Sequence, residues 1–201
     1  MQIYSTYKRY SIFSKRAFTL VELVVVVAIA TVVMTSIIIQ QTKWSDRLIV
    51  NTQSYELALM IRQAQTYSLG VREYMAGTGD KFDLGYGLYF NQGTLDRYIF
   101  FADANKNQKY DVGEVMETKL LTRGVVINRV CGATRCMPSG GPLNNVSISF
   151  FRPETRANIA LLNNGGSSVD VPPVTIYLRS SGGKEYSVKV EANGQVSIAQ
   201  T

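Results

Sequence analysis

Residues 18–39 read FTLVELVVVVAIATVVMTSIII and carry one charged side chain, Glu22. At about 1.5 Å per residue, a helix of this length crosses the roughly 30 Å hydrocarbon core of a bilayer. The Leu, Ile, Val and Phe side chains make the free energy of membrane insertion favourable. Their contribution outweighs the cost of inserting the single acid. The sequence therefore predicts that residues 18–43 form the transmembrane half of an N-terminal helix.

The charges before this segment predict its orientation. Lys8, Arg9, Lys15 and Arg16 precede it, and no acidic residue lies among them. Because basic residues that flank a span stay on the cytoplasmic side, we expect residues 1–17 in the cytoplasm and everything after the span to be exported. A cleavable secretory signal is the rival interpretation, but its apolar core would be shorter and a small-residue cleavage motif would follow it.

The junction between the basic leader and the apolar run reads KRAFTLVEL over residues 15–23. A carboxylate near the start of a span is costly unless it meets a positive partner, and the simpler alternative is a tolerated interfacial acid. The junction resembles the processing signal of type IV prepilins. The resemblance implies cleavage between Ala17 and Phe18, N-methylation of Phe18, and pairing of Glu22 with the N-terminal ammonium of a neighbouring subunit. Ala17 departs from the glycine that the family usually has before the cut.

The same resemblance implies a function and a location. It implies a minor pilin or pseudopilin, a structural subunit of a type IV pilus or a type II secretion pseudopilus and not an enzyme. Its expected partners are other pilin or pseudopilin subunits, the prepilin peptidase, an inner-membrane assembly platform and the lipid of the bacterial inner membrane. The globular domain would be periplasmic or extracellular. The alternative is a pilin-fold component of a DNA-uptake (competence) filament.

The helix is expected to continue beyond the membrane as an amphipathic segment over residues 44–72. Neither Pro nor Gly occurs between Phe18 and Leu69, so nothing local forces a break. Many members of the family have a proline in this helix that the chain lacks. Apolar side chains then recur at steps of three and four residues, as one buried face of a helix requires: Leu57, Met60, Ile61, Ala64, Tyr67 and Val71.

After Gly85 the pattern changes to short segments rich in β-formers and separated by turn residues. They are residues 86–90, 98–102, 115–121, 125–130, 146–151, 174–179, 186–190 and 196–199. We expect an α+β, pilin-like domain over residues 44–201, in which the amphipathic helix packs on an antiparallel β-sheet. The segments from residue 146 onward resemble the closing strands of the GspH/FimT group of minor pilins and pseudopilins.

Residues 103–114 read DANKNQKYDVGE, which has the ligand spacing of a calcium loop. Calcium takes six to eight oxygens, and a twelve-residue loop supplies them from positions one, three, five, seven, nine and twelve. The candidate ligands are Asp103, Asn105, Asn107, the backbone carbonyl of Lys109, Asp111 and Glu114. Against calcium, Gln108 stands where an EF-hand needs glycine, and strands flank the loop. The open alternative is an ordinary capped turn, since Asn, Asp and Gly dominate such loops.

The two cysteines, Cys131 and Cys136, are separated by four residues that include a glycine. An exported domain would allow a disulfide between them, and the alternative is two buried thiols. The sequence contains no histidine, which excludes serine–histidine and cysteine–histidine nucleophile pairs. No cofactor other than calcium is indicated.

Nucleic-acid binding is weakly supported, although the formal net charge is +6. Removing the four basic residues of the leader leaves 17 basic and 15 acidic residues. Arg179, Lys184 and Lys189 lie near the C-terminus, but Glu185 and Glu191 interrupt them, whereas phosphate binding needs adjacent basic side chains.

Overall fold

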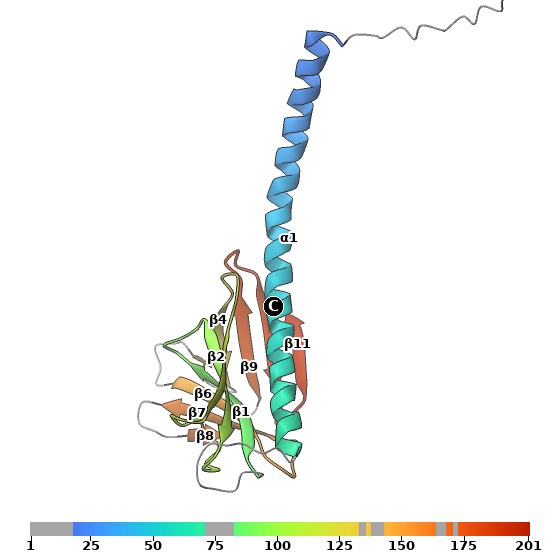
Figure 1. Ribbon diagram of the computed structural model, residues 1–201. Helices are drawn as coiled ribbons and strands as arrows, with labels where there is room; N and C mark the ends of the chain where they lie inside the picture. Colours follow the sequence, from blue (N-terminus) through green and yellow to red (C-terminus); the bar gives the residue numbers. More distant parts are fainter. Residues whose placement is uncertain (1–17, 71–82, 133–135, 138–142, 164–167, 171–172) are drawn as a thin grey trace, which may run out of the picture. The chain divides into compact units, whose positions relative to one another are not determined.

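The computed structural model describes residues 18–70, 83–132, 136–137, 143–163, 168–170 and 173–201 (Figure 1). By its internal contacts the chain divides into two units, Met1–Thr42 and Lys43–Thr201. The second unit holds all of the strands.

Among the described residues there is one helix, α1, which runs from Leu20 to Leu69 and confirms the expected long N-terminal helix. Thr19 caps its start, because the Thr19 side-chain oxygen accepts a hydrogen bond from the Glu22 NH at 3.2 Å. The helix ends immediately before Gly70, whose NH donates to the carbonyl of Thr66 at 3.0 Å. Residues 71 and 72, which the sequence prediction included, lie outside the described residues.

Within the second unit, one face of α1 is buried, as the apolar periodicity predicted. Leu57, Ile61 and Ala64 have no exposed surface, and Tyr67 packs against the same core. The first three are spaced by four and three residues, so they lie on one side of the helix. This face belongs to a core that also contains side chains from both sheets described below.

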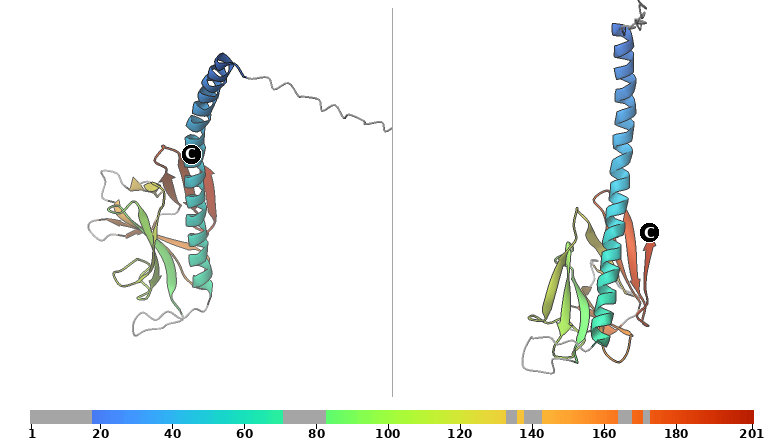
Figure 2. Two further views of the ribbon diagram at one scale, coloured as in Figure 1. Left: turned by 45° about the horizontal axis from the view of Figure 1, so that its top comes forward. Right: turned by 45° about the vertical axis from the view of Figure 1, so that its right-hand side comes forward.

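The strands form two antiparallel sheets (Figures 1 and 2). The six-stranded sheet has the order β3-β2-β1-β6-β7-β8, and the five-stranded sheet has the order β11-β10-β9-β4-β5. The strands of the first are β1 Gly85–Asn91, β2 Arg97–Asp103, β3 Val115–Leu120, β6 Leu143–Phe150, β7 Ala157–Asn163 and β8 Ser168–Asp170. Those of the second are β4 Val126–Cys131, β5 Cys136–Met137, β9 Val174–Arg179, β10 Glu185–Val190 and β11 Val196–Gln200.

The α+β fold class is confirmed, and all eight expected strands are present within a residue or a few at their ends. The strands are divided between two sheets where the sequence analysis expected one. This division follows from distant pairings, such as β1 with β6 and β4 with β9, which local periodicity does not encode. The strands that were not predicted are β5, β7 and β8, and two of these have only two or three residues.

The six-stranded sheet is buried on both faces at β1 and β2, whereas its edge strand β3 is largely exposed. On the inner face, the ring of Tyr67 from α1 meets Tyr86 at 5.6 Å and Phe100 at 5.8 Å between ring centres. On the outer face, the β2–β3 loop folds back so that the Tyr110 ring lies 4.4 Å from Tyr89 and 5.7 Å from Phe101. The loop therefore acts as a second cover.

Polar contacts hold this loop against the outer face. The NH of Tyr110 donates to the hydroxyl of Ser147, and the hydroxyl of Ser149 donates to the carbonyl of Gln108, each at 3.4 Å. Gly87 lies on the same face, where a Cβ atom would come within 2.8 Å of the Phe101 ring. Close packing on this face thus requires a residue without a side chain.

Candidate functional site

The predicted cleavage junction lies at the edge of the described chain. Ala17 and the leader 1–17 are outside the described residues. Phe18 precedes the helix, and its side chain is 74 % exposed. Glu22 lies in the first turn of α1, three residues after the capping residue Thr19. An acid at this position is also favoured by the helix dipole, so helix capping is a competing reason for Glu22.

The first part of α1 presents an apolar surface all round. The large apolar side chains between Leu20 and Ile39 are each 50 to 80 % exposed. By length and composition, α1 is the one helix among the described residues that could cross a membrane. Apolar area left in water costs about 25 cal/mol per Å², so this surface requires lipid or other apolar helices around it.

A second apolar surface lies on the outward side of α1 in the unit Lys43–Thr201. We call it the outer stripe: Trp44, Leu48, Tyr55 and Leu59, which are 56 to 72 % exposed. Their spacing of four, seven and four residues places them within about 60° around the helix. The apolar periodicity predicted only the buried face of the helix, so this stripe was not predicted. The spacing of the four apolar residues was the signal that could have revealed the stripe.

A groove lies on each side of the outer stripe. One has a volume of about 330 Å³ and lies between α1 and the β3–β4 turn, where Leu48 and Thr52 face Arg123. The other has a volume of about 220 Å³ and lies between α1 and β11, with Tyr55 and Leu59 in its wall. The stripe therefore forms a ridge between two grooves. A neighbouring helix or strand can pack against a surface of this shape.

The two outermost acids of the predicted calcium loop are buried and accept hydrogen bonds from the loop backbone. The carboxylate oxygens of Asp103 accept from the NH groups of Asn107 at 3.1 Å and Gln108 at 2.6 Å. Those of Glu114 accept from the NH groups of Ala104 at 2.9 Å and Asp111 at 2.8 Å. All four carboxylate oxygens therefore have backbone partners.

The other candidate ligands form hydrogen bonds with one another within the same loop. The amide groups of Asn105 and Asn107 each donate to one oxygen of Asp111 at 2.6 Å. The NH of Lys109 donates to the side-chain oxygen of Asn107 at 2.9 Å. Gln108 adopts a φ of 66°, so the position where an EF-hand has glycine is left-handed here as well.

This arrangement fits a self-capped turn. Among the described residues, no group of three or more His, Cys, Asp or Glu side chains is placed to hold a metal ion. Calcium binding by the loop therefore stays a prediction. Burial raises the pKa of Asp103 to about 6, while the NH groups of Gln108 and Asn107 act in the opposite direction.

Two acids outside this loop, Asp83 and Asp96, form surface ion pairs. Asp83 meets Lys106 and Arg152, each at 3.1 Å, and Asp96 meets Arg97 at 2.8 Å. Hydrogen bonds from these cations lower the pKa of Asp83 and of Asp96. Carboxylates held in the ionised form suit surface pairing rather than proton transfer.

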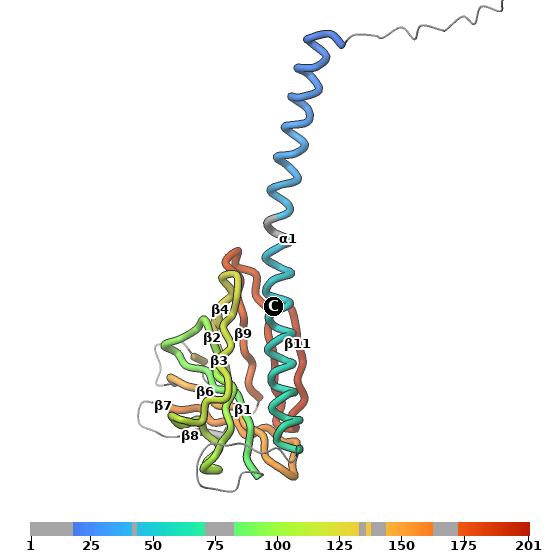
Figure 3. Tube along the Cα trace, viewed as in Figure 1, coloured from blue at the N-terminus to red at the C-terminus, as the bar shows by residue number. Residues whose placement is uncertain are grey.

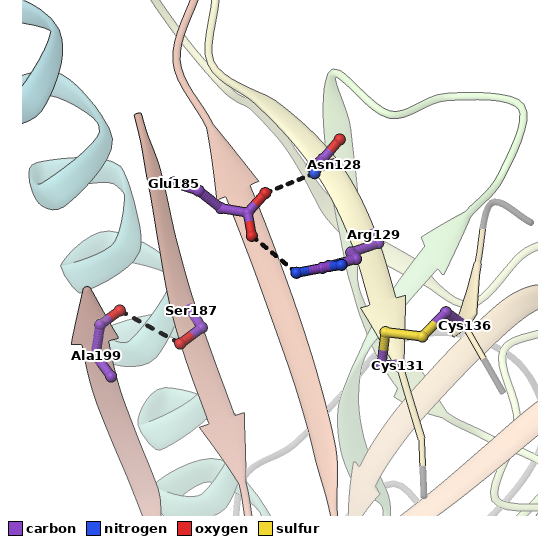
Figure 4. A network of polar contacts seen from close by, with 7 residues as sticks. All are labelled: Asn128, Arg129, Cys131, Cys136, Glu185, Ser187 and Ala199. Carbon is purple, nitrogen blue, oxygen red and sulfur yellow. Dashed lines mark hydrogen bonds and ion pairs between the residues drawn. A yellow bond between two sulfur atoms is a disulfide. The ribbon is translucent and has the colours of Figure 1, made fainter. Parts of the chain in front are cut away.

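The structure contains the Cys131–Cys136 disulfide, which joins the end of β4 to β5 (Figure 4). Of the two alternatives left open by the sequence, it shows the disulfide. Beside it on the five-stranded sheet, Glu185 accepts hydrogen bonds from Asn128 at 2.6 Å and Arg129 at 3.1 Å (Figure 4). The disulfide therefore links the edge strand β5 to β4, a strand that Glu185 of β10 also contacts.

Of the three cations near the C-terminus, Lys189 is ion-paired, whereas Arg179 and Lys184 are exposed. Lys189 is paired with Glu191 at 2.6 Å, and Arg129 is paired with Glu185 and lies 4.0 Å from the centre of the Tyr177 ring. Paired cations present little net charge to a phosphate backbone.

Comparison with known proteins finds a family match on the N-terminal segment. No curated protein and no solved structure is found to match the chain. Residues 12–38 match the family described as the prokaryotic N-terminal methylation motif. This match covers the predicted junction at Ala17 and Phe18, together with Glu22 and most of the apolar run. Together with the apolar helix α1 on an antiparallel sheet, it supports a type IV pilin-like protein that is anchored in a membrane.

Proposed function

We propose that this chain is a minor pilin or pseudopilin, a structural subunit that enters a type IV pilus or a type II secretion pseudopilus by packing of its N-terminal helix. The apolar surface of α1 carries this proposal. In the first unit, apolar side chains are exposed all round the helix beside the single acid Glu22. In the second unit, the outer stripe is an exposed apolar surface along one face of the helix. A lipid bilayer before assembly and neighbouring helices afterwards would each remove this area from water.

The N-terminal motif supplies the steps before assembly. The prepilin peptidase would cut between Ala17 and Phe18 on the cytoplasmic side, and the new Phe18 amine would be methylated. Glu22 would then pair with the N-terminal ammonium of a neighbouring subunit, which neutralises a charge that is costly inside an apolar bundle. The N-terminus is cytoplasmic in this proposal, and the globular domain is periplasmic or extracellular.

Membership of the GspH/FimT group belongs to the same proposal. The segments that carry the resemblance form β6 in the six-stranded sheet and the three consecutive neighbours β9, β10 and β11 in the other. A closing hairpin array of this kind beside the N-terminal helix is compatible with that group.

Two substitutions of Glu22 test the assembly step. Glu22→Ala removes both the charge and the polar side chain of the first turn, whereas Glu22→Gln keeps a residue that suits a capping box. We expect both variants to be cleaved and methylated, as the intact mass of a chain beginning at Phe18 would show. We also expect both to be depleted from purified filaments. Wild-type incorporation of Glu22→Gln would contradict the charge pairing and would leave Glu22 as a capping residue.

A further inference from the structure

The two longer edge strands, β3 and β11, differ in how well they are protected from pairing with another chain. β3 carries Glu117 and Lys119, which are ion-paired with each other at 2.6 Å, and its register shifts opposite Phe100 and Phe101. Charged side chains and bulges are the usual means of keeping an edge strand from pairing with another chain. β11 reads VSIAQ, with no charge and no proline, and its register with β10 is regular. Its edge is therefore unprotected.

The backbone groups along this edge can be assigned from the pairing with β10. The Glu191 NH bonds to the Gln195 carbonyl, and the Thr201 NH bonds to the Glu185 carbonyl. Hydrogen-bonded pairs alternate in an antiparallel ladder, so Ser197 and Ala199 also bond to β10. The NH and carbonyl groups of the even-numbered residues then point to the open edge: Val196, Ile198 and Gln200.

An apolar groove lies next to the same strand. β11 lies beside α1 (Figure 3), and Val196 and Ile198 form one wall of the groove of about 220 Å³ while Tyr55 and Leu59 form the other. Val196 and Ile198 are partly buried against the core, whereas Tyr55 and Leu59 are 56 and 60 % exposed. A strand added beside β11 would place alternate side chains over these apolar residues.

The charges beside the groove indicate what charge a strand added beside β11 should carry. Arg62 lines the groove, and it forms no ion pair among the residues that the structure describes. Arg47 lies at the other end of β11 and donates to the neutral groups of Gln200 and Tyr186. Antiparallel pairing of two copies of β11 about Ile198 would bring Arg47 of one copy towards Arg62 of the other. Like charges oppose that pairing, and an acidic partner is favoured.

We propose that β11 accepts an extended, acid-bearing segment of a neighbouring filament subunit as a sixth strand of the five-stranded sheet. This inference rests on the proposed function, because it needs an assembled filament. The contact is between unlike surfaces, which is the type of contact that builds an open helical array rather than a closed dimer. Main-chain hydrogen bonds supply affinity. The apolar groove with Arg62 in its lining, together with Arg47 beside Gln200, selects the segment.

Hydrogen exchange of single amides tests the added strand in the full-length chain. We expect the amides of Val196, Ile198 and Gln200 to exchange at least about tenfold more slowly in purified filaments than in detergent-solubilised subunits. Ser197 and Ala199, which bond to β10, should be slow in both samples. Equal rates for the three edge amides in the two samples would overturn the proposal.

A pair of substitutions at Ile198 distinguishes the contribution of its backbone NH from that of its side chain. Ile198→Pro removes an NH that the fold does not use, and Ile198→Ala removes the same side-chain contacts but keeps that NH. We expect Ile198→Pro to be incorporated at least about fivefold less than Ile198→Ala, at similar melting temperatures. If Ile198→Pro does not fold, Val196→Pro and Val196→Ala serve as the second pair. Equal incorporation of a folded proline variant and its alanine partner would overturn the proposal. Absence of the wild-type chain from filaments would instead count against the proposed function.

Discussion

The two faces of the six-stranded sheet are covered by different means. On the inner face, α1 and the five-stranded sheet bury aromatic and aliphatic side chains such as Tyr86 and Phe100. On the outer face, a polar loop covers Phe101 and is itself held by the carboxylates of Asp103 and Glu114. The inner cover depends on apolar area removed from water, and the outer cover depends on satisfied backbone NH groups. The two covers should therefore respond to different changes.

The largest effect is expected on the inner face, from Leu57→Ala. Leu57 has no exposed surface, and truncating a buried leucine costs about 2–5 kcal/mol through lost transfer free energy and the cavity left behind. Leu59→Ala is the matched control, because Leu59 is 60 % exposed and surface changes stay within about 0.5 kcal/mol. Denaturant unfolding of the full-length chain in detergent measures both. Equal losses would show that the outer side of α1 is also part of the core.

The outer face should respond to pH through Asp103. The pKa of this carboxyl is raised to about 6 in the folded chain and is near 3.9 in an unfolded one. The folded state therefore binds the proton more tightly, and the free energy of unfolding falls as pH rises from about 4 to about 6, by about 3 kcal/mol in total. Asp103→Asn cannot titrate, so it should lack this contribution.

Unfolding of both proteins at several pH values, with a chelator present, isolates this contribution. The difference between wild type and Asp103→Asn removes the contributions of other carboxyls, including Asp83 and Asp96, whose lowered pKa values act with the opposite sign. A difference that does not vary between about pH 4 and 7 would count against a buried, titrating Asp103.

The smallest effect is expected from calcium at the same loop. An ion that binds only the folded state adds RT ln(1 + [L]/Kd), which is about 1.4 kcal/mol when calcium is at ten times its Kd. The melting temperature should then rise by a few degrees, and Asp103→Ala or Glu114→Ala should abolish that rise. Asp96→Ala should retain it, because Asp96 lies outside the loop. A calcium titration with neither a shift nor a heat signal would leave the loop as a self-capped turn.

The candidate cleavage and assembly residues could be singled out because their signal is local, and their roles stay predictions. Ala17, Phe18 and Glu22 lie within one short motif, and a matching family covers that motif. Ligand spacing singled out the loop from Asp103 to Glu114, but not the use of both end carboxylates by backbone NH groups. Their burial depends on how the loop meets the sheet, and spacing contains no information about that contact.

The outer stripe and the open edge of β11 illustrate the opposite case. Residues such as Tyr55 and Leu59 are apolar, and apolar residues in an amphipathic helix are expected in the core. Only the position of the two sheets shows which side of α1 they occupy. The lack of charge in β11 is visible in the sequence, but the strand becomes an edge only through the order of its sheet.

The amino-acid sequence by itself determined the apolar span, the continuation of the helix beyond it and the places of eight of the described strands. These features follow from composition, periodicity and turn residues within a few positions of one another. Only the tertiary structure decided which sheet each strand joins, that a polar loop buries Phe101, and that β11 ends its sheet beside Tyr55. These depend on pairing between segments that are far apart in the chain, and the free energy of such pairing is not contained in any one segment.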